Sequence, residues 1–392
     1  MPDHATPAPR RTLLAACLAH LAHDGFTDML YVFFPVWQGV FALSYAQVGL
    51  MKSLYSGTLA LCQIPAGMLA GRLGPCRLLV VGTLLASAAL FLAGTADTAV
   101  ALGGLLALGG VGASVQHPLA SAAIAQAYAG QGSRVALSTY NFVGDMGKLL
   151  LPAAAGILLA RMDWQNALQA LSLAGVATGL ALPFLFGRPA RGVAPDVREA
   201  QAPSTRMRDL ITPGFVALNA IGVLDSATRM GLLTFLPFLL REKGADMNLL
   251  GIALGLVFAG GCAGKLVCGV VASRAGVLRS IIVTEACTAP FILALPPLPL
   301  WGALCLCPIL GMALNGTSSA LYGSVPELIP RERRGQAFAV YYTAAIGAGA
   351  AAPYCYGMLS DALGLQPALQ ATGLTVLAAI PLTLPLRGRL SA

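Results

Sequence analysis

Twelve long apolar segments divide this sequence, and no other feature constrains its fold so strongly. A helix needs about 20 apolar residues to cross the hydrocarbon core of a bilayer. Hydrophobic residues make up 57% of the 392 residues and charged residues 10%, whereas soluble domains are about 25% charged. This composition excludes a soluble enzyme and a disordered chain, and it predicts an all-α integral membrane protein. The expected transmembrane helices are 12–38, 46–71, 77–95, 98–128, 134–160, 164–187, 211–240, 247–273, 278–297, 300–328, 335–360 and 366–386.

The basic residues are distributed unevenly between the two sides of these spans. Of the 24 lysines and arginines, 17 fall in segments on one side, 3 on the other side and 4 within spans. Lysine and arginine accumulate on the cytoplasmic side of membrane proteins. We therefore expect both termini to be cytoplasmic in a multi-pass protein of the bacterial inner membrane. The net charge of +8 then reflects topology and does not indicate a nucleic-acid partner.

The two halves of the chain repeat one another at a nearly constant offset. Residues 188–210 are polar and rich in proline and arginine, which is typical of a flexible linker. Several polar and helix-breaking residues before this linker recur 201 or 202 residues later. The matched positions are Asp24 with Asp225, Pro35 with Pro237, Arg72 with Arg274, Arg77 with Arg279, and Pro152 with Pro353. The repeat predicts two six-helix halves, 1–187 and 211–392, joined by a cytoplasmic linker, an architecture typical of secondary transporters.

Three segments of the first half carry a family resemblance. The loop GMLAGRLGPCR at 67–77 resembles the loop 2–3 signature of the major facilitator superfamily, although Gly71 replaces its acidic residue and Ser273 does so in the second copy. The segments 112–118 and 140–147 are similar to the fosmidomycin-resistance branch of that superfamily. The resemblance implies a major facilitator fold, alternating access and a small organic solute. Because fosmidomycin is a phosphonate, it also favours an anionic solute.

Ionisable residues within spans are costly in a bilayer, so each is a candidate functional residue. His20, Asp24 and Asp28 follow one another at intervals of four residues and share one helical face. We expect this face to line a wet cavity; static pairing between helices is the alternative. Asp24 is the preferred proton carrier, because no lysine or arginine shares its face and a buried carboxylate without a nearby cation holds a proton readily. Asp28 and His20 complete the predicted proton-coupling set.

Two acid–base pairs are expected within single helices. Asp145 with Lys148 and Asp225 with Arg229 stand three and four residues apart, so each pair could neutralise itself. Arg229 also takes the place that Asp28 has in the first half, which predicts a contact between the halves that opens and closes during transport. Glu285 is a weaker candidate, expected to reach the membrane surface or to pair with Lys265. The predicted gating or structural residues are Arg72, Arg77, Asp145, Pro152, Asp225, Arg274, Arg279 and Pro353.

The solute is expected to meet basic and hydrogen-bonding side chains. Arg229, Lys148 and His117 could attract an anion, since arginine holds phosphonate or carboxylate in a fork and lysine acts as a point charge. Packing or interfacial anchoring is the alternative for the tyrosines. The predicted solute-binding residues are His23, His117, Tyr140, Asn141, Lys148, Arg229, Asn315, Tyr341 and Tyr342.

These features predict a secondary active transporter that exchanges a small organic solute or drug for protons, in the direction of efflux. Uptake of a metabolite is the first alternative. A copper importer is the second, given 11 methionines and 9 cysteines, but no Met/His spacing supports it and no metal site is predicted. An enzyme is not expected, because no HExxH or GxSxG motif occurs. We expect no cofactor and no nucleic-acid partner, and a monomer whose partners are the solute, protons and the lipid bilayer.

Overall fold

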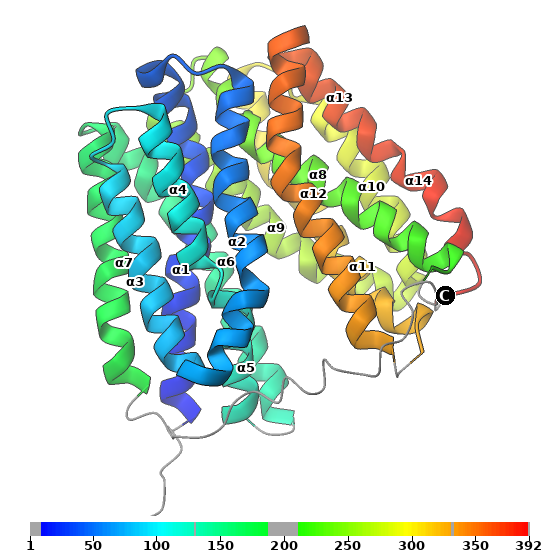
Figure 1. Cartoon of the computed structure of the whole chain (residues 1–392). Helices are drawn as coiled ribbons and strands as arrows, with labels where there is room; N and C mark the ends of the chain where they lie inside the picture. Colours follow the sequence, from blue (N-terminus) through cyan, green and yellow to red (C-terminus); the bar gives the residue numbers. More distant parts are fainter. Residues whose placement is uncertain (1–8, 129–130, 187–210, 331–332, 391–392) are drawn as a thin grey trace, which may run out of the picture. The chain divides into compact units, whose positions relative to one another are not determined.

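The computed structural model describes residues 9–128, 131–186, 211–330 and 333–390, and every regular element in these ranges is a helix (Figure 1). The predicted linker 188–210 lies outside the described residues. The first half contains α1 (Pro9–Phe41), α2 (Tyr45–Leu73), α3 (Pro75–Ala93), α4 (Ala99–Ala113), α5 (Gln116–Ala127), α6 (Gln131–Leu159) and α7 (Trp164–Phe186). The second half contains α8 (Pro213–Glu242), α9 (Met247–Ala275), α10 (Val277–Ala294), α11 (Leu300–Leu328), α12 (Arg334–Leu363), α13 (Leu365–Leu377), α14 (Ala379–Leu382) and the short 3₁₀ helix η4 (Leu384–Leu386).

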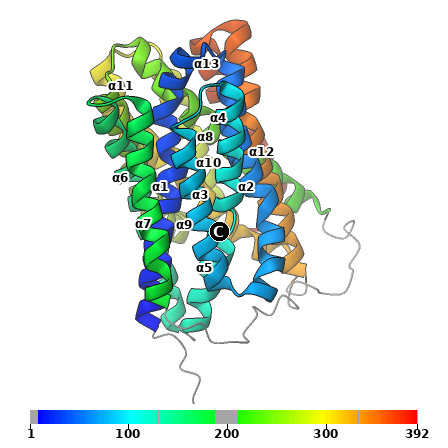
Figure 2. The same cartoon turned by 60° about the vertical axis from the view of Figure 1, so that its left-hand side comes forward.

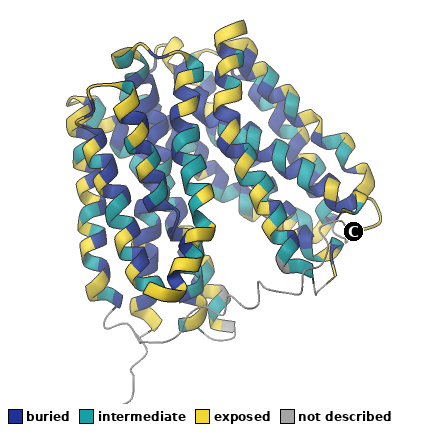
Figure 3. Ribbon diagram, viewed as in Figure 1, coloured by how far each residue is buried: buried dark blue, intermediate teal, exposed yellow. Residues whose placement is uncertain are grey.

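The twelve predicted spans correspond to these helices, with α4 and α5 together forming one span and α13, α14 and η4 forming the last. Within the described ranges, nine helical segments are long and apolar enough to cross a membrane. Helices α1, α2 and α12 are not among them. In α1, two histidines and two aspartates in the middle of the helix lower the mean hydropathy. Large apolar side chains such as Leu61 and Phe184 are 77% and 83% exposed, and exposed residues lie along the outer faces of the helices (Figure 3).

The expected single span at 98–128 is broken into two helices. Helix α4 ends at Ala113 and α5 begins at Gln116. Pro118 has no main-chain N–H, so it cannot donate to the carbonyl of Ser114 four residues earlier. The hydroxyl of Ser114 turns back to donate to the carbonyl oxygen of Val111 at 2.7 Å. The break places His117 in the first turn of α5.

The sequence repeat is visible in the helix boundaries. Helices α2 and α9 are each 29 residues long and begin 202 residues apart. Each is followed by a tight turn at a glycine of the repeated loop, Gly74 with φ of 85° and Gly276 with φ of 89°. Residues that carry a side chain rarely adopt a backbone conformation with positive φ, so glycine is favoured at both turns.

The chain divides into two compact units, which are described separately. Unit 1 comprises Met1–Val36 and Leu54–Val197, and unit 2 comprises Trp37–Ser53 and Arg198–Ala392. In unit 1, α3 lies beside both α4 and α7 (Figure 2), and an apolar core joins α1, α2, α3, α5, α6 and α7. In unit 2, a second core joins α8, α10, α11 and α12 with α14 and η4.

Candidate functional site

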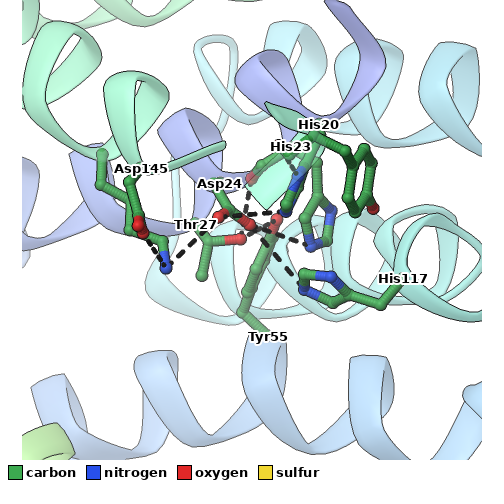
Figure 4. Close-up of polar contacts among 9 residues, drawn as sticks. His20, His23, Asp24, Thr27, Tyr55, His117 and Asp145 are labelled. Atoms are coloured by element: carbon green, nitrogen blue, oxygen red, sulfur yellow. Dashed lines mark hydrogen bonds and ion pairs between the residues drawn. The ribbon is translucent and has the colours of Figure 1, made fainter. Parts of the chain in front are cut away.

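Three polar residues of α1 lie on one buried face of unit 1. His20, Asp24 and Asp28 are 3%, 5% and 7% exposed, and their spacing of four residues aligns them along the helix. His23 is also buried, at 8%. Figure 4 shows that the His20, His23 and Asp24 side chains point toward one another. The three side chains therefore share one largely buried face, as their spacing predicts. That this face lines a wet cavity stays a prediction.

Helix α6 holds the His20 imidazole in place. Nδ1 of His20 lies 2.9 Å from the main-chain carbonyl oxygen of Tyr140. The His20 imidazole also stacks on the phenol ring of Tyr140, with centroids 4.0 Å apart and an interplanar angle of 19°. Because a carbonyl oxygen can only accept, Nδ1 carries the hydrogen, and the neutral ring then has its lone pair on Nε2. That Nε2 lies 3.2 Å from Oδ2 of Asp24.

Two further histidines approach the same carboxylate. Nε2 of His23 and Nε2 of His117 each lie 3.8 Å from Oδ1 of Asp24. Their rings meet edge-on, with centroids 4.8 Å apart. The His117 side chain is 48% exposed, so the cluster is open on the side of α5. His23 and His117, which were predicted to bind the solute, therefore lie beside the predicted proton-coupling residue Asp24.

Lys148 of α6 lies between the carboxylates of the site. Its Nζ is 3.3 Å from Oδ2 of Asp24 and 3.4 Å from Oδ1 of Asp145, and it also interacts electrostatically with Asp28. The predicted Asp145–Lys148 pair is confirmed. The expectation that Asp24 has no nearby cation is wrong, because the cation comes from another helix and not from the stripe itself.

Tyr55 of α2 belongs to the site, although no feature of the sequence predicted it. Its side chain is fully buried, its hydroxyl lies 3.3 Å from Oγ1 of Thr27, and it interacts with Asp24 and Asp28. A cavity of about 10 Å³, lined by His23, Tyr55 and Gln116 among others, adjoins the cluster, and it has about the volume that one water molecule needs. A tyrosine among apolar residues gives no sequence signal for this role, since buried packing explains it equally well.

The site in unit 1 carries more negative than positive charge. Asp24, Asp28 and Asp145 are three buried carboxylates, and the lysine among them supplies one positive charge. Carboxylates buried in this way need positive charge or bound protons nearby. The donor atoms of His20, Asp24 and His117 all lie within 4.8 Å of one another. Protons, a cationic group or a metal ion could each offset this charge.

Unit 2 contains a smaller polar group. Nη2 of Arg229 lies 3.6 Å from Oδ2 of Asp225, which confirms the predicted pair. Glu285 is 1% exposed and interacts with both of these residues, so the expectation that it reaches the membrane surface is wrong. The structure places its helix α10 against α11 and α13, which cover it. The predicted contact between Asp28 and Arg229 joins the two units and stays a prediction.

The other predicted residues are distributed over both units. Tyr341 is buried and lies over Gly222, where a side chain would overlap its ring. Tyr342 is 46% exposed, and its ring is tilted by 57° against that of Tyr322, with centroids 5.0 Å apart. Nδ2 of Asn315 donates to the carbonyl oxygen of Gly311 at 3.2 Å. The exposed members are Asn141, Arg72, Arg77, Arg274 and Arg279, and Pro152 and Pro353 are buried within α6 and α12.

Comparison with known proteins decides the family. The model of the Major Facilitator Superfamily matches residues 16–353, with a second match over 218–391. The chain belongs to the major facilitator superfamily. The superfamily resemblance that the loop at 67–77 indicated is confirmed, whereas the fosmidomycin-resistance branch is not specified by this match. The proteins that the chain resembles are named as transport or drug-resistance proteins and not as enzymes.

Curated relatives of this major facilitator protein are distant. It is 27% identical over 236 residues to multidrug resistance protein MdtL of Salmonella schwarzengrund (strain CVM19633), and 26% identical over the same length to MdtL of Salmonella typhi. Each match covers 59% of this chain and 59% of the relative. The chain therefore matches about three fifths of the length of these relatives.

Solved structures of other transporters share the fold. A bacterial homolog of the human lysosomal transporter Spinster, in an inward-facing and occupied conformation, aligns with a TM-score of 0.81, 18% identity and 98% of each chain covered. The nucleoside transporter NupG aligns with a TM-score of 0.80 and 14% identity, covering 96% of this chain and 100% of that one. At these identities the similarity establishes the fold alone.

Proposed function

We propose that this major facilitator protein exports a small organic solute by alternating access, in exchange for protons. The observation that carries the proposal is the buried cluster of unit 1, in which three carboxylates surround one lysine. Charges buried in a membrane protein mark substrate and ion pathways. Distant similarity to proteins named for multidrug resistance supports the direction of export.

The charge of the cluster favours a solute with a positively charged group. Lys148, His117 and Arg229 were the residues on which the expectation of an anionic solute depended. In the structure, however, Lys148 lies within 3.4 Å of two carboxylates and Arg229 pairs with Asp225. An anion would have to displace these carboxylates, whereas a cationic group would offset the excess negative charge.

Exchange follows from the same charge balance. Protons that enter from outside and a cationic solute that leaves the cytoplasm are alternative sources of positive charge for one buried cluster. Because the cluster takes up only a limited amount of positive charge, binding of protons favours release of the solute, and binding of the solute favours release of protons. The membrane potential adds about 2.3 kcal/mol per transferred charge per 100 mV to the driving force for proton entry.

Accumulation in an efflux-deficient bacterium tests the proposal. Labelled fosmidomycin and a lipophilic cation such as ethidium would be compared in cells that carry the native protein, Asp24→Asn, Asp97→Asn or an empty vector. Asp97 is exposed and lies outside the site, so its variant is the matched control. We expect the native protein and Asp97→Asn to lower accumulation of the cation several-fold, and Asp24→Asn or collapse of the proton gradient to abolish the effect.

The other outcomes identify the alternatives. Higher accumulation with the native protein would make it an importer, which is the second candidate function. Lower accumulation of fosmidomycin but not of the cation would show that the solute is anionic.

We also propose a monomer in the bacterial inner membrane with both termini in the cytoplasm. Reporter fusions at the C-terminus that are active only in the cytoplasm would check the orientation.

A further inference from the structure

We infer that His20, Asp24 and His117 bind a divalent transition-metal ion. Two imidazole nitrogens and one carboxylate oxygen, contributed by α1 and α5, lie within 4.8 Å of one another. Imidazole and carboxylate are the ligands that ions such as Zn²⁺ and Co²⁺ accept in proteins. The inference concerns the site of the proposed function but does not depend on its coupling ion.

The orientation of His20 matches that of a metal ligand. Metal-bound histidines donate their second ring N–H to a carbonyl or carboxylate, which fixes the tautomer. His20 donates from Nδ1 to the carbonyl oxygen of Tyr140 at 2.9 Å. Its buried Nε2 faces Oδ2 of Asp24 at 3.2 Å.

The spacing of the donor atoms also suits an ion. Nε2 of His20 and Oδ2 of Asp24 are 3.2 Å apart, and a lone pair on each atom would face the other. Two ligands of a tetrahedral ion, each about 2.1 Å from the metal, are about 3.4 Å apart. Nε2 of His117 lies 3.8 Å from the other oxygen of Asp24, so a small movement of its half-exposed side chain would complete a set of three ligands.

A divalent ion would add positive charge beside the carboxylate of Asp24, which His20, His23, His117 and Lys148 approach. When the ion binds, the ion pair between Lys148 and Asp24 would break, and the pair between Lys148 and Asp145, with Nζ 3.4 Å from Oδ1, would remain. Three protein ligands leave a fourth position open, as at zinc sites that bind water or substrate. The exposed side of His117 gives an ion and a fourth ligand access to it.

Cobalt binding to the purified full-length protein tests the inference. Co²⁺ in a tetrahedral nitrogen–oxygen site absorbs visible light, and titration calorimetry gives its affinity and stoichiometry. We expect one Co²⁺ per chain, displaced by Zn²⁺ but not by Mg²⁺. His117→Gln and Asp24→Asn should weaken binding by about tenfold to a hundredfold.

A matched variant separates the ligands from carboxylates outside the site. Asp97→Asn removes an exposed carboxylate. It should bind Co²⁺ within about threefold of native. Absence of a Co²⁺ spectrum in the native protein, or native affinity in His117→Gln, would overturn the inference.

A second measurement uses only the native protein, in case a variant fails to fold. Diethyl pyrocarbonate modifies accessible imidazoles, and His117 is the half-exposed histidine of the site. Zn²⁺ should slow the modification of His117 by about tenfold, as read by mass spectrometry, while Mg²⁺ should not. Equal rates with and without Zn²⁺ would contradict the inference. Neither test involves transport, so metal binding that persists without efflux would refute only the proposed function.

Discussion

The Nδ1 atom of His20 lies 2.9 Å from the carbonyl oxygen of Tyr140, and the ring of Tyr140 stacks on the same imidazole. The two residues are 120 positions apart in the chain. Helix α6 thus fixes both the position and the tautomer of a histidine on α1. This contact sets which nitrogen faces Asp24 and therefore what the site can bind.

Gly144 makes room for that histidine. A Cβ atom at this position would lie 2.4 Å from Cε1 of His20. Gly144→Ala should lower the free energy of unfolding by about 1–3 kcal/mol, because overpacking forces the ring to shift, and it should weaken Co²⁺ binding by about tenfold. Thermal unfolding and calorimetry would measure both effects. Gly57→Ala is the control, since a Cβ there meets nothing within 4 Å, and equal behaviour of the two variants would contradict the assignment.

Removing Lys148 should deprive the carboxylates of Asp24 and Asp145 of an ammonium group that lies 3.3 and 3.4 Å from them. Breaking a buried pair costs about 3–5 kcal/mol, and the cost should be at the low end because the Lys148 side chain is 30% exposed. Chemical denaturation of Lys148→Gln, Asp145→Asn and the double variant would measure the coupling. We expect the double variant to be more stable than the sum of the single effects predicts, by about 0.5–3 kcal/mol. Additive effects would show that the 3.4 Å contact does not stabilise the fold.

Asp361 of α12 should stabilise the start of α2. Its two carboxylate oxygens accept from the main-chain N–H groups of Tyr45 and Ala46 at 2.8 and 2.9 Å. The first N–H groups of a helix have no partner within the helix, and a capping carboxylate is worth about 1 kcal/mol. Asp361→Ala should lower the free energy of unfolding by about that amount, and Asp361→Asn, which keeps one acceptor oxygen, by less. If Asp361→Asn is as damaging as Asp361→Ala, charge and not capping explains the contact.

Tyr45 gives a prediction for alkaline pH. It is the first residue of α2, just before the predicted span 46–71. Burial raises the pKa of its phenol above the ordinary value, and the carboxylates of Glu242 and Asp361 raise it further. The folded protein therefore keeps this proton at a pH where the unfolded chain has lost it, so stability falls as pH rises above about 10. Tyr45→Phe should lose less stability than the native protein between about pH 9 and about pH 11, as followed by thermal unfolding, and parallel curves would refute the shift.

Features that depend on neighbours along one helix could be predicted from the sequence. The pairs Asp145–Lys148 and Asp225–Arg229 stand three and four residues apart, so helical geometry alone brings them together. The alignment of His20 with Asp24 follows from the same spacing. The number of spans and the repeat were also readable, because apolar length and a constant offset do not depend on packing.

Features that join different helices depended on the tertiary structure. Lys148 contacts Asp24 from α6, and His117 contacts it from α5. The Asp24 carboxylate therefore has a nearby cation, although no lysine or arginine shares its face of α1. The burial of Glu285 likewise follows from helices packed over α10. The sequence by itself determined which polar residues lie within the spans, because about 20 apolar residues are needed for each helix to cross the bilayer. Only the packing of α1 against α5 and α6 decided which of them share one carboxylate, since residues about a hundred positions apart have no register until the helices meet.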